Sequence, residues 1–369
     1  MVLKRCMFSN YNYKYSAYLT TSSPVPFSIT TKKISSSRLP TTTLLPRLNF
    51  NSSIVRTQVS VSVSSIQPSS DARLRRRHIK YPQQADKGQK RFWKEVHVRE
   101  VDYGLQIYLD TRPLRRSNSK ILTIPSTKPH LATAIALEWD FLDSARHALK
   151  PHLTPLTSLT SRALDIAESD ATQGTTDSGA IRNDIVKILL RYLDTDSLLC
   201  WAPNPPPEIP GYETHVSRIV PLRQLQRRTA EPIITFLEEK LWPGISIKPV
   251  LEEDSIIPRA QSPETRLIIR NWVHGLNAFN LAALERATLA GKGILGAARL
   301  VAEWGEDFQY LTQNNCPKSN RFGVEEAAAA ASLEMEWQIK MWGLVEDTHD
   351  VEREDLRRQL GSVILLVSG

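Results

Sequence analysis

The sequence predicts an α+β fold, with a small N-terminal antiparallel β domain followed by a larger α-helical domain. Between Arg91 and Ile124, apolar and polar residues alternate in short runs, which is the pattern of strands covered on one face. Beyond residue 150, apolar residues recur at helical spacing in almost every segment. We therefore expect a β-rich domain with a covering helix over residues 91–150 and a helical domain over residues 151–369.

Residues 1–80 differ from the rest of the chain in composition. They are rich in Ser and Thr, and no Asp or Glu occurs before Asp71. The eight Lys and Arg residues among residues 1–70 account for the whole formal charge of +8. A basic, acid-free and Ser-rich segment is typical of a mitochondrial transit peptide, and a disordered basic tail is the alternative. We expect processing between Val55 and Lys90.

The remainder of the chain is close to neutral, which argues against one class of partner. A protein that binds duplex nucleic acid needs concentrated positive charge, so we expect no nucleic-acid partner. The cysteines, Cys6, Cys200 and Cys316, are widely spaced, so neither a disulfide framework nor a zinc site is expected. No apolar run approaches the ~18 residues that a membrane-spanning helix needs, so no stable membrane insertion is expected.

A helix is expected to cover the small sheet. Turns at residues 102–104 and 112–113 separate the strand-like runs. Ser126 or Thr127 can cap the helix that follows, and Pro129 fits its first turn. The helix then presents an apolar face toward the sheet.

Glu138 falls in the middle of that apolar face, with Trp139 and Asp140 beside it. A carboxylate that faces a core costs on the order of several kcal/mol unless it is paired or protonated. Three roles remain open for Glu138: an ion pair with a buried Arg, a general acid or base, or a group that orders the junction between two domains. We favour the ion pair.

The helical domain is expected to consist of several helices joined by polar loops. The expected helices cover about 157–166, 181–193, 222–241, 263–290, a segment that ends at residue 304, 324–350 and 351–367. Pro232 should kink or split its helix. Residues 245–250 alternate as a short strand does, and residues 167–179 are expected to form a loop.

The stretch from Val324 to Asp350 has two neighbouring stripes on a helical wheel. The stripe expected to face the core consists of Ala330, Leu333, Trp337, Met341 and Leu344. The stripe beside it consists of Glu334, Gln338, Trp342, Val345 and His349. A polar and aromatic stripe of this kind indicates a face that meets something other than the core. A surface helix with solvated acids is the alternative.

No catalytic motif stands out in the chain. The sequence contains no GxxxxGK[ST] phosphate loop and no GxSxG nucleophile elbow. Asp194 and Asp196 match a phosphotransfer DxD, and His349-Asp350 matches a phosphohydrolase pair, but matches of two or three residues are weak. Thr348 or Asp350 is more readily explained as a helix cap. We expect no cofactor and no metal.

Six ordered blocks carry a more specific signal. They are RFWKEV (91–96), GLQIYLDTRPL (104–114), AIALEWD (134–140), LTPLTSLTSRALD (153–165), LDTDSLLC (193–200) and LEMEWQIKMWGLVEDTHD (333–350). In this order and spacing, the chain resembles the mitochondrial ATP synthase F1 complex assembly factor 2 family from about Arg91 onward. Residues 167–179 and 203–220 depart from the family pattern and have the character of insertions.

The resemblance implies a two-domain fold and a chaperone rather than an enzyme. The family's partner is the unassembled α subunit of the ATP synthase, whose β-facing surface the chaperone shields through a transient interface. The resemblance also implies a location in the mitochondrial matrix or at the matrix face of the inner membrane. The alternative is a matrix enzyme of unrecognised type that uses Glu138 or His349.

Two groups of site residues follow from the resemblance. The partner-binding residues carried over to this chain are Glu334, Gln338, Trp342, Glu346 and Asp350. The residues carried over to the domain junction are Glu138, Trp139 and Asp140.

Overall fold

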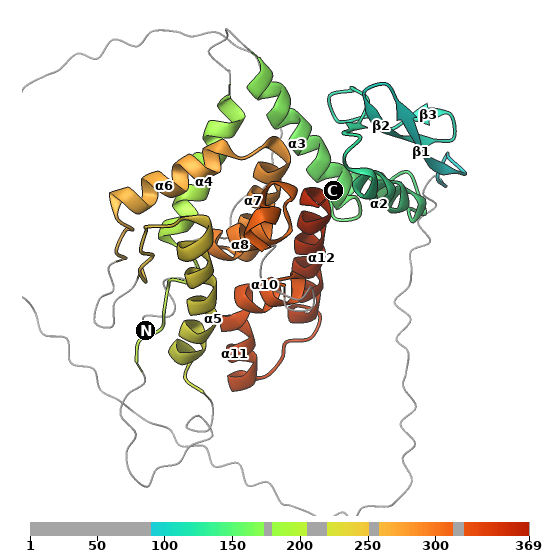
Figure 1. Ribbon diagram of the computed structural model, residues 1–369. Helices are drawn as coiled ribbons and strands as arrows, with labels where there is room; N and C mark the ends of the chain where they lie inside the picture. The colour runs from blue at the N-terminus through green and yellow to red at the C-terminus, as the bar shows by residue number, and fades with distance from the viewer. Residues whose placement is uncertain (1–89, 173–178, 205–219, 251–257, 313–320, 369) are drawn as a thin grey trace, which may run out of the picture. The chain divides into compact units, whose positions relative to one another are not determined.

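Two six-residue strands form the centre of a small antiparallel sheet in the computed structural model (Figure 1). β1 (Val96–Val101) and β2 (Gly104–Leu109) form a hairpin in which Val96 lies opposite Leu109. Two shorter strands pair with the other edge of β2: β3 (Arg112–Pro113) and β4 (Thr123–Ile124). The predicted antiparallel sheet is therefore confirmed.

The structure describes residues 90–172, 179–204, 220–250, 258–312 and 321–368, which belong to one compact unit, Asp86–Gly369. The expected leader, its processing point and most of segment 203–220 lie outside the described residues. The division of this unit into domains at residue 150 stays a prediction.

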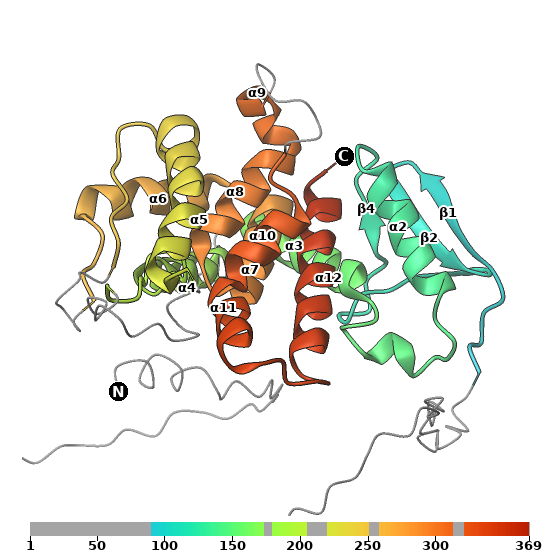
Figure 2. The ribbon, with the colours of Figure 1, turned by 90° about the horizontal axis from the view of Figure 1, so that it is seen from below.

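Helix α2 (Pro129–Asp140) covers one face of the sheet (Figure 2). Leu131 and Ile135 on α2 are fully buried in one core with Ile107 of β2. Pro129 occupies the first turn, as predicted, but the cap prediction was wrong. The N-cap position belongs to Lys128, and no side chain caps the helix there.

Lys128 has a different role, which links α2 to the end of the chain's last helix. Its buried ammonium group donates a 3.3 Å hydrogen bond to the carbonyl of Val367 and lies 3.3 Å from Glu306 Oε2. A cation at a helix C-terminus satisfies a free carbonyl and complements the helix dipole. This contact therefore joins the sheet-covering helix to the helical part of the unit.

The helical part is built around α7 (Ala278–Gly291), which packs against α3, α8 and α12 (Figures 1 and 2). Residues on several sides of α7 are buried, as expected of a central helix. The helices packed on it are α3 (Pro155–Ala171), α8 (Ile294–Trp304) and α12 (His349–Val367). The others are α4 (Ala180–Asp194), α5 (Leu222–Phe236), α6 (Pro263–Gly275), α9 (Gln309–Thr312), α10 (Val324–Ala331) and α11 (Leu333–Trp342). Short 3-10 turns are η1 (His147–Leu149) and η4 (Glu306–Phe308), and η3 (Leu237–Leu241) is a π turn.

Several predicted helix boundaries were wrong. The expected 263–290 helix breaks after α6, because Leu276 is extended and Asn277 caps α7 by accepting a 2.8 Å bond from the amide of Asn280. α3 continues to Ala171, so the expected 167–179 loop starts later. Residues 245–250 form no strand. Pro232 lies inside α5 without splitting it, and a π turn follows at η3.

Asp196 caps α8 from a distant part of the chain. Gly293, the N-cap residue of α8, has no side chain to do so. The fully buried carboxylate of Asp196 instead accepts bonds of 2.9 Å from the amides of both Leu198 and Leu295. Burial raises the pKa of Asp196 to about 6, although the bonds from these amides oppose that shift. This burial and capping give Asp196 a structural role in place of a phosphotransfer one.

We expect Gly293→Ala to destabilise the protein by about 1–3 kcal/mol, because its methyl group would lie 2.6 Å from Asp196 Oδ1. Gly293 has an extended backbone, so the cost is steric. Gly275→Ala is the matched control, since a methyl group there has no atom within 4 Å. Urea unfolding measures both variants, and equal stability of the two would contradict the close approach.

Asp196 should also give the stability a distinctive pH dependence. Its folded-state pKa of about 6 exceeds the ordinary value of 3.8, so the folded protein holds the proton more tightly than the unfolded chain. The stabilisation is present below pH ~4 and is lost as the pH rises through about 6, with a total of up to about 3 kcal/mol. We expect the free energy of unfolding of the wild type, relative to Asp196→Asn, to fall over this range in urea titrations. Parallel pH profiles for the two proteins would contradict this.

Candidate partner interface

The stretch from Val324 to Asp350 is not one helix. α10 ends at Ser332, which has a non-helical backbone, and α11 ends at Trp342, because Gly343 takes a positive φ of 93°. Residues 343–348 form a loop that leads from α11 into α12 (Figures 1 and 2). We call residues 333–358 the α11–α12 hairpin.

The predicted core stripe was wrong beyond its first member. Ala330 on α10 is buried, whereas α11 contains no buried residue. Leu333, Trp337 and Met341 are only half-buried, and Leu344 is exposed in the loop. α11 contacts α5 and α10, and the indole of Trp337 donates a 3.0 Å bond to the carbonyl of Val220. α11 therefore attaches to the surface of the helical part and does not enter its core.

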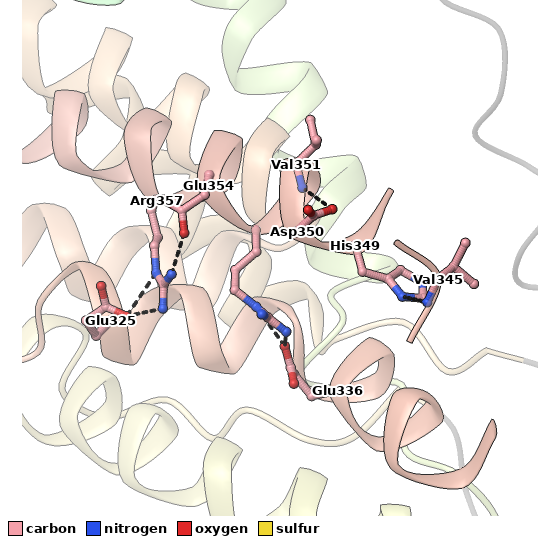
Figure 3. Close-up of polar contacts among 9 residues, drawn as sticks. Glu325, Glu336, Val345, His349, Asp350, Val351, Glu354 and Arg357 are labelled. Atoms are coloured by element: carbon pink, nitrogen blue, oxygen red, sulfur yellow. Dashed lines mark hydrogen bonds and ion pairs between the residues drawn. The ribbon is translucent and has the colours of Figure 1, made fainter. Parts of the chain in front are cut away.

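Two arginines of α12 hold the hairpin in place (Figure 3). Arg353 donates from Nε to Glu336 Oε1 of α11 at 3.1 Å. Arg357 donates two bonds of 2.9–3.0 Å to Glu325 of α10 and one of 2.7 Å to Glu354. These arginines were not predicted, because nothing in the local pattern of either helix indicates the pairing.

The loop is closed by a reciprocal pair of bonds between Val345 and His349 (Figure 3). The amide of Val345 donates to His349 Nδ1 at 3.1 Å, and the amide of His349 donates to the carbonyl of Val345 at 3.3 Å. Thr348 occupies the N-cap position of α12 but makes no capping bond with its side chain. His349 therefore acts as an acceptor that shapes the loop.

The predicted partner-binding residues all lie on the hairpin, but they do not form one helical stripe. Glu334 and Gln338 share α11 and are joined by a 3.2 Å bond, and Trp342 ends that helix. Glu346 lies in the loop, and Asp350 in the first turn of α12 accepts a 3.0 Å bond from the amide of Val351. The loop breaks the expected spacing, although every residue of the set except half-buried Gln338 is exposed.

Large apolar side chains are exposed around the same loop. The ring of Trp342 is 70% exposed and stands edge-on to Trp337 at 6.2 Å. The other exposed apolar residues are Leu344, Val345 and Val351. We call these four residues the loop patch. Exposed acids, Glu346, Asp347 and Asp350, lie among these residues along the loop and the first turn of α12. A segment that exposes several large apolar side chains together with charged ones is typical of an interaction site.

The second predicted group, Glu138, Trp139 and Asp140, lies where α2 leads into α3. The carboxylate of Glu138 accepts bonds from the amides of Leu156 and Thr157, at 2.8 and 3.0 Å, and from the Thr157 hydroxyl at 2.6 Å. The indole of Trp139 donates to the same hydroxyl at 2.9 Å. The favoured ion pair of Glu138 with a buried Arg was therefore wrong, because the first turn of α3 supplies the donors.

Asp140 differs from its two neighbours because its side chain is exposed. It pairs with Arg91 at 3.3 Å, which ties the end of α2 to the start of the described chain. Burial raises the pKa of Glu138, and the bonds from Thr157 and Leu156 oppose that shift. These three residues thus occupy a junction between the sheet-covering helix and the first helix beyond it.

The described residues contain no group of His, Cys, Asp and Glu side chains that could hold a metal ion. None of their helices is long and apolar enough to cross a membrane.

Comparison with known proteins identifies the relatives of the chain. Residues 90–238 match the family model described as ATP12 chaperone protein. The chain is 31% identical to "Protein atp12, mitochondrial" of Schizosaccharomyces pombe over 277 residues, which cover 75% of this chain and 81% of the relative. It is 30% identical to "Protein ATP12, mitochondrial" of Saccharomyces cerevisiae over 293 residues, with coverage of 74% and 82%.

The fold also resembles a solved structure. The crystal structure of Atp12 from Paracoccus denitrificans matches with a TM-score of 0.53 and 23% identity, over 75% of this chain and 97% of that chain. This likeness supports the α+β fold with a small antiparallel sheet and a mostly helical remainder.

The junction residues allow a sharp test of their structural role. We expect Trp139→Arg to lower the free energy of unfolding by about 3 kcal/mol or more, because it removes the packing against Trp93 at 5.5 Å and the bond to Thr157. Asp140→Asn is the control, and its exposed pair should change stability by under ~1 kcal/mol. Thermal and urea unfolding measure both. A Trp139→Arg protein as stable as the control would exclude a structural junction.

Proposed function

The chain belongs to the ATP12 chaperone family, and from this we propose that it assists assembly of the catalytic head of the mitochondrial ATP synthase. We propose further that it binds the unassembled α subunit, here called the client, and shields the surface meant for the neighbouring β subunit. The motif blocks of residues 91–350 and the names of the relatives support this proposal.

The observation that carries the proposal is the loop patch on the α11–α12 hairpin. An unassembled subunit exposes an apolar surface that is prone to aggregation. Trp342 is a suitable anchor for such a surface, because a Trp side chain contributes a large contact area and has few rotatable bonds. The ion pairs of Arg353 with Glu336 and of Arg357 with Glu325 join α12 to α11 and α10. These contacts hold the helix that carries Trp342 in place.

The exposed acids of the hairpin suit an interface that must later separate. Glu334, Glu346 and Asp350 are exposed on it, and contacts that remain close to water contribute more to specificity than to affinity. A patch of four apolar residues is small compared with an obligate interface. We infer a transient complex that gives way when the β subunit arrives.

We propose the mitochondrial matrix as the compartment of this chaperone, in line with the mitochondrial names of its relatives. The alternative of a matrix enzyme has no observation in its favour. Glu138 already accepts three hydrogen bonds from α3, and His349 accepts the amide of Val345.

The proposal predicts a loss of client binding without a loss of fold. Trp342→Ser and Glu334→Lys should each weaken capture of purified α subunit at least tenfold, because they alter an exposed anchor and an exposed acid of the hairpin. Their melting temperatures should stay within about 2 °C of the wild type, since neither side chain is buried. Tyr310→Ser, which changes a 66% exposed aromatic residue on α9, is the matched control.

Pull-down with purified α subunit and with the finished catalytic head measures this specificity. The wild type should retain the free subunit and not the assembled head. Full capture by both hairpin variants, or unfolding of both, would exclude the loop patch as the interface.

A further inference from the structure

A groove lies beside the sheet, and none of its residues belongs to the α11–α12 hairpin. It has a volume of about 430 Å³. Its apolar walls are Phe92, Trp93, Leu109, Leu114, Trp139, Ala145 and Ala148, and Arg112, Pro113 and Arg115 complete it. A groove of this size has room for a few side chains of a bound segment.

The groove leaves apolar and aromatic side chains exposed to solvent. Phe92 is 60% exposed, although its ring packs edge-on against buried Trp93 at 4.8 Å. Ala145 and Ala148 are small, so the covering segment leaves the space open. The nearby side chain of Leu149 is also exposed. This surface is available to an apolar side chain from outside the described residues.

Three residues of the groove, Arg112, Arg115 and Trp93, carry N–H groups that no described carboxylate accepts. Arg112 lies over the ring of Phe92, with 5.8 Å between its guanidinium carbon and the ring centre, and pairs with no carboxylate of the described residues. Arg115 donates to the carbonyl of Ser119 at 2.7 Å and likewise pairs with no described carboxylate. The buried indole N–H of Trp93 has no hydrogen-bond partner there either.

Ion pairs with carboxylates neutralise only some of the described arginines, and Arg112 and Arg115 are among those that they leave unpaired. Nine described arginines form ion pairs with Asp or Glu: Arg91, Arg116, Arg162, Arg182, Arg227, Arg266, Arg353, Arg357 and Arg358. The two guanidinium groups at the groove therefore present positive charge beside an apolar floor. The complementary ligand has an apolar side chain flanked by carboxylates.

We propose that this groove is a second docking site, which receives an acidic and apolar segment of the partner protein. The inference rests on the proposed function, under which that segment belongs to the α subunit. Charge complementarity with Arg112 and Arg115 selects an acidic segment, and the exposed ring of Phe92 selects an apolar side chain within it. The groove and the loop patch would then hold the client at two separate points.

Two binding measurements on the full chain test the proposal. The first uses fluorescence anisotropy with a labelled synthetic peptide in which two Leu residues lie between pairs of Glu, and a matched peptide with Lys in place of Glu. The second uses purified α subunit. The test variant combines Arg112→Glu with Arg115→Glu, and the control combines Arg228→Glu with Arg270→Glu, two exposed arginines on α5 and α6.

We expect the test variant to bind both the acidic peptide and the α subunit at least tenfold more weakly, while the control binds both as the wild type does. Phe92→Ser should also weaken peptide binding. Because Phe92 is largely exposed, this substitution should leave the protein folded. The wild-type affinity for the acidic peptide should fall as salt is raised.

The outcomes separate this inference from the proposed function. Equal binding of the Glu and Lys peptides, or unchanged α-subunit binding by the test variant, would overturn the docking site. If the wild type captures no α subunit, the proposed function fails. In that case the docking site is tested by the peptides alone. If the wild type prefers the Glu peptide to the Lys peptide and the test variant does not, the groove is still supported as a site for an acidic, apolar segment.

Discussion

The carboxylate of Glu138 holds together the two parts of the described unit. It closes the first turn of α3 by accepting both free amides and the Thr157 hydroxyl, so the direction in which the chain leaves α2 is fixed. An unpaired buried carboxylate would be costly, and these three donors offset that cost. α3 in turn packs on α7, so this cap, together with the contact of Lys128 with the end of α12, fixes the position of the sheet relative to the central helix.

Short-range sequence patterns correctly predicted the first strands and the helix that covers them. Alternation gave the β1–β2 hairpin, and Pro129 gave the start of α2. The break at Ser332 was not predictable from propensity, because no Gly or Pro marks it and packing decides where α10 stops, whereas Gly275 does precede the break at Leu276. The capping of α8 by Asp196 was also not predictable, because Asp196 and the amide of Leu295 that it binds are 99 positions apart in the sequence.

The same reasoning explains why the candidate interface was predicted only in part. Glu334, Gln338 and Trp342 follow helical spacing, and the structure keeps them together on α11. Glu346 and Asp350, which the resemblance supplied, were expected on the same helix, but Gly343 ends that helix before it reaches them. Among the apolar residues assigned to the core, Leu333, Trp337 and Met341 are only half-buried because α11 rests on the surface, and Leu344 is exposed in the loop. Apolar residues at helical spacing therefore predict a face that makes contacts, but they do not distinguish contact with the protein's own core from contact with a partner.

The position of α12 in the chain has a consequence for biogenesis. Its residues Leu360, Val363, Leu366 and Val367 are buried, and α12 packs on α2, α3 and α7, which precede it by up to about 240 positions. A chain that emerges vectorially from a ribosome or a translocation channel therefore cannot close this core until those four residues are free. Until then, an incomplete chain would expose the apolar surface of α2, α3 and α7 that α12 covers in the folded protein. The chaperone would therefore itself be prone to aggregation while it is being synthesised or imported.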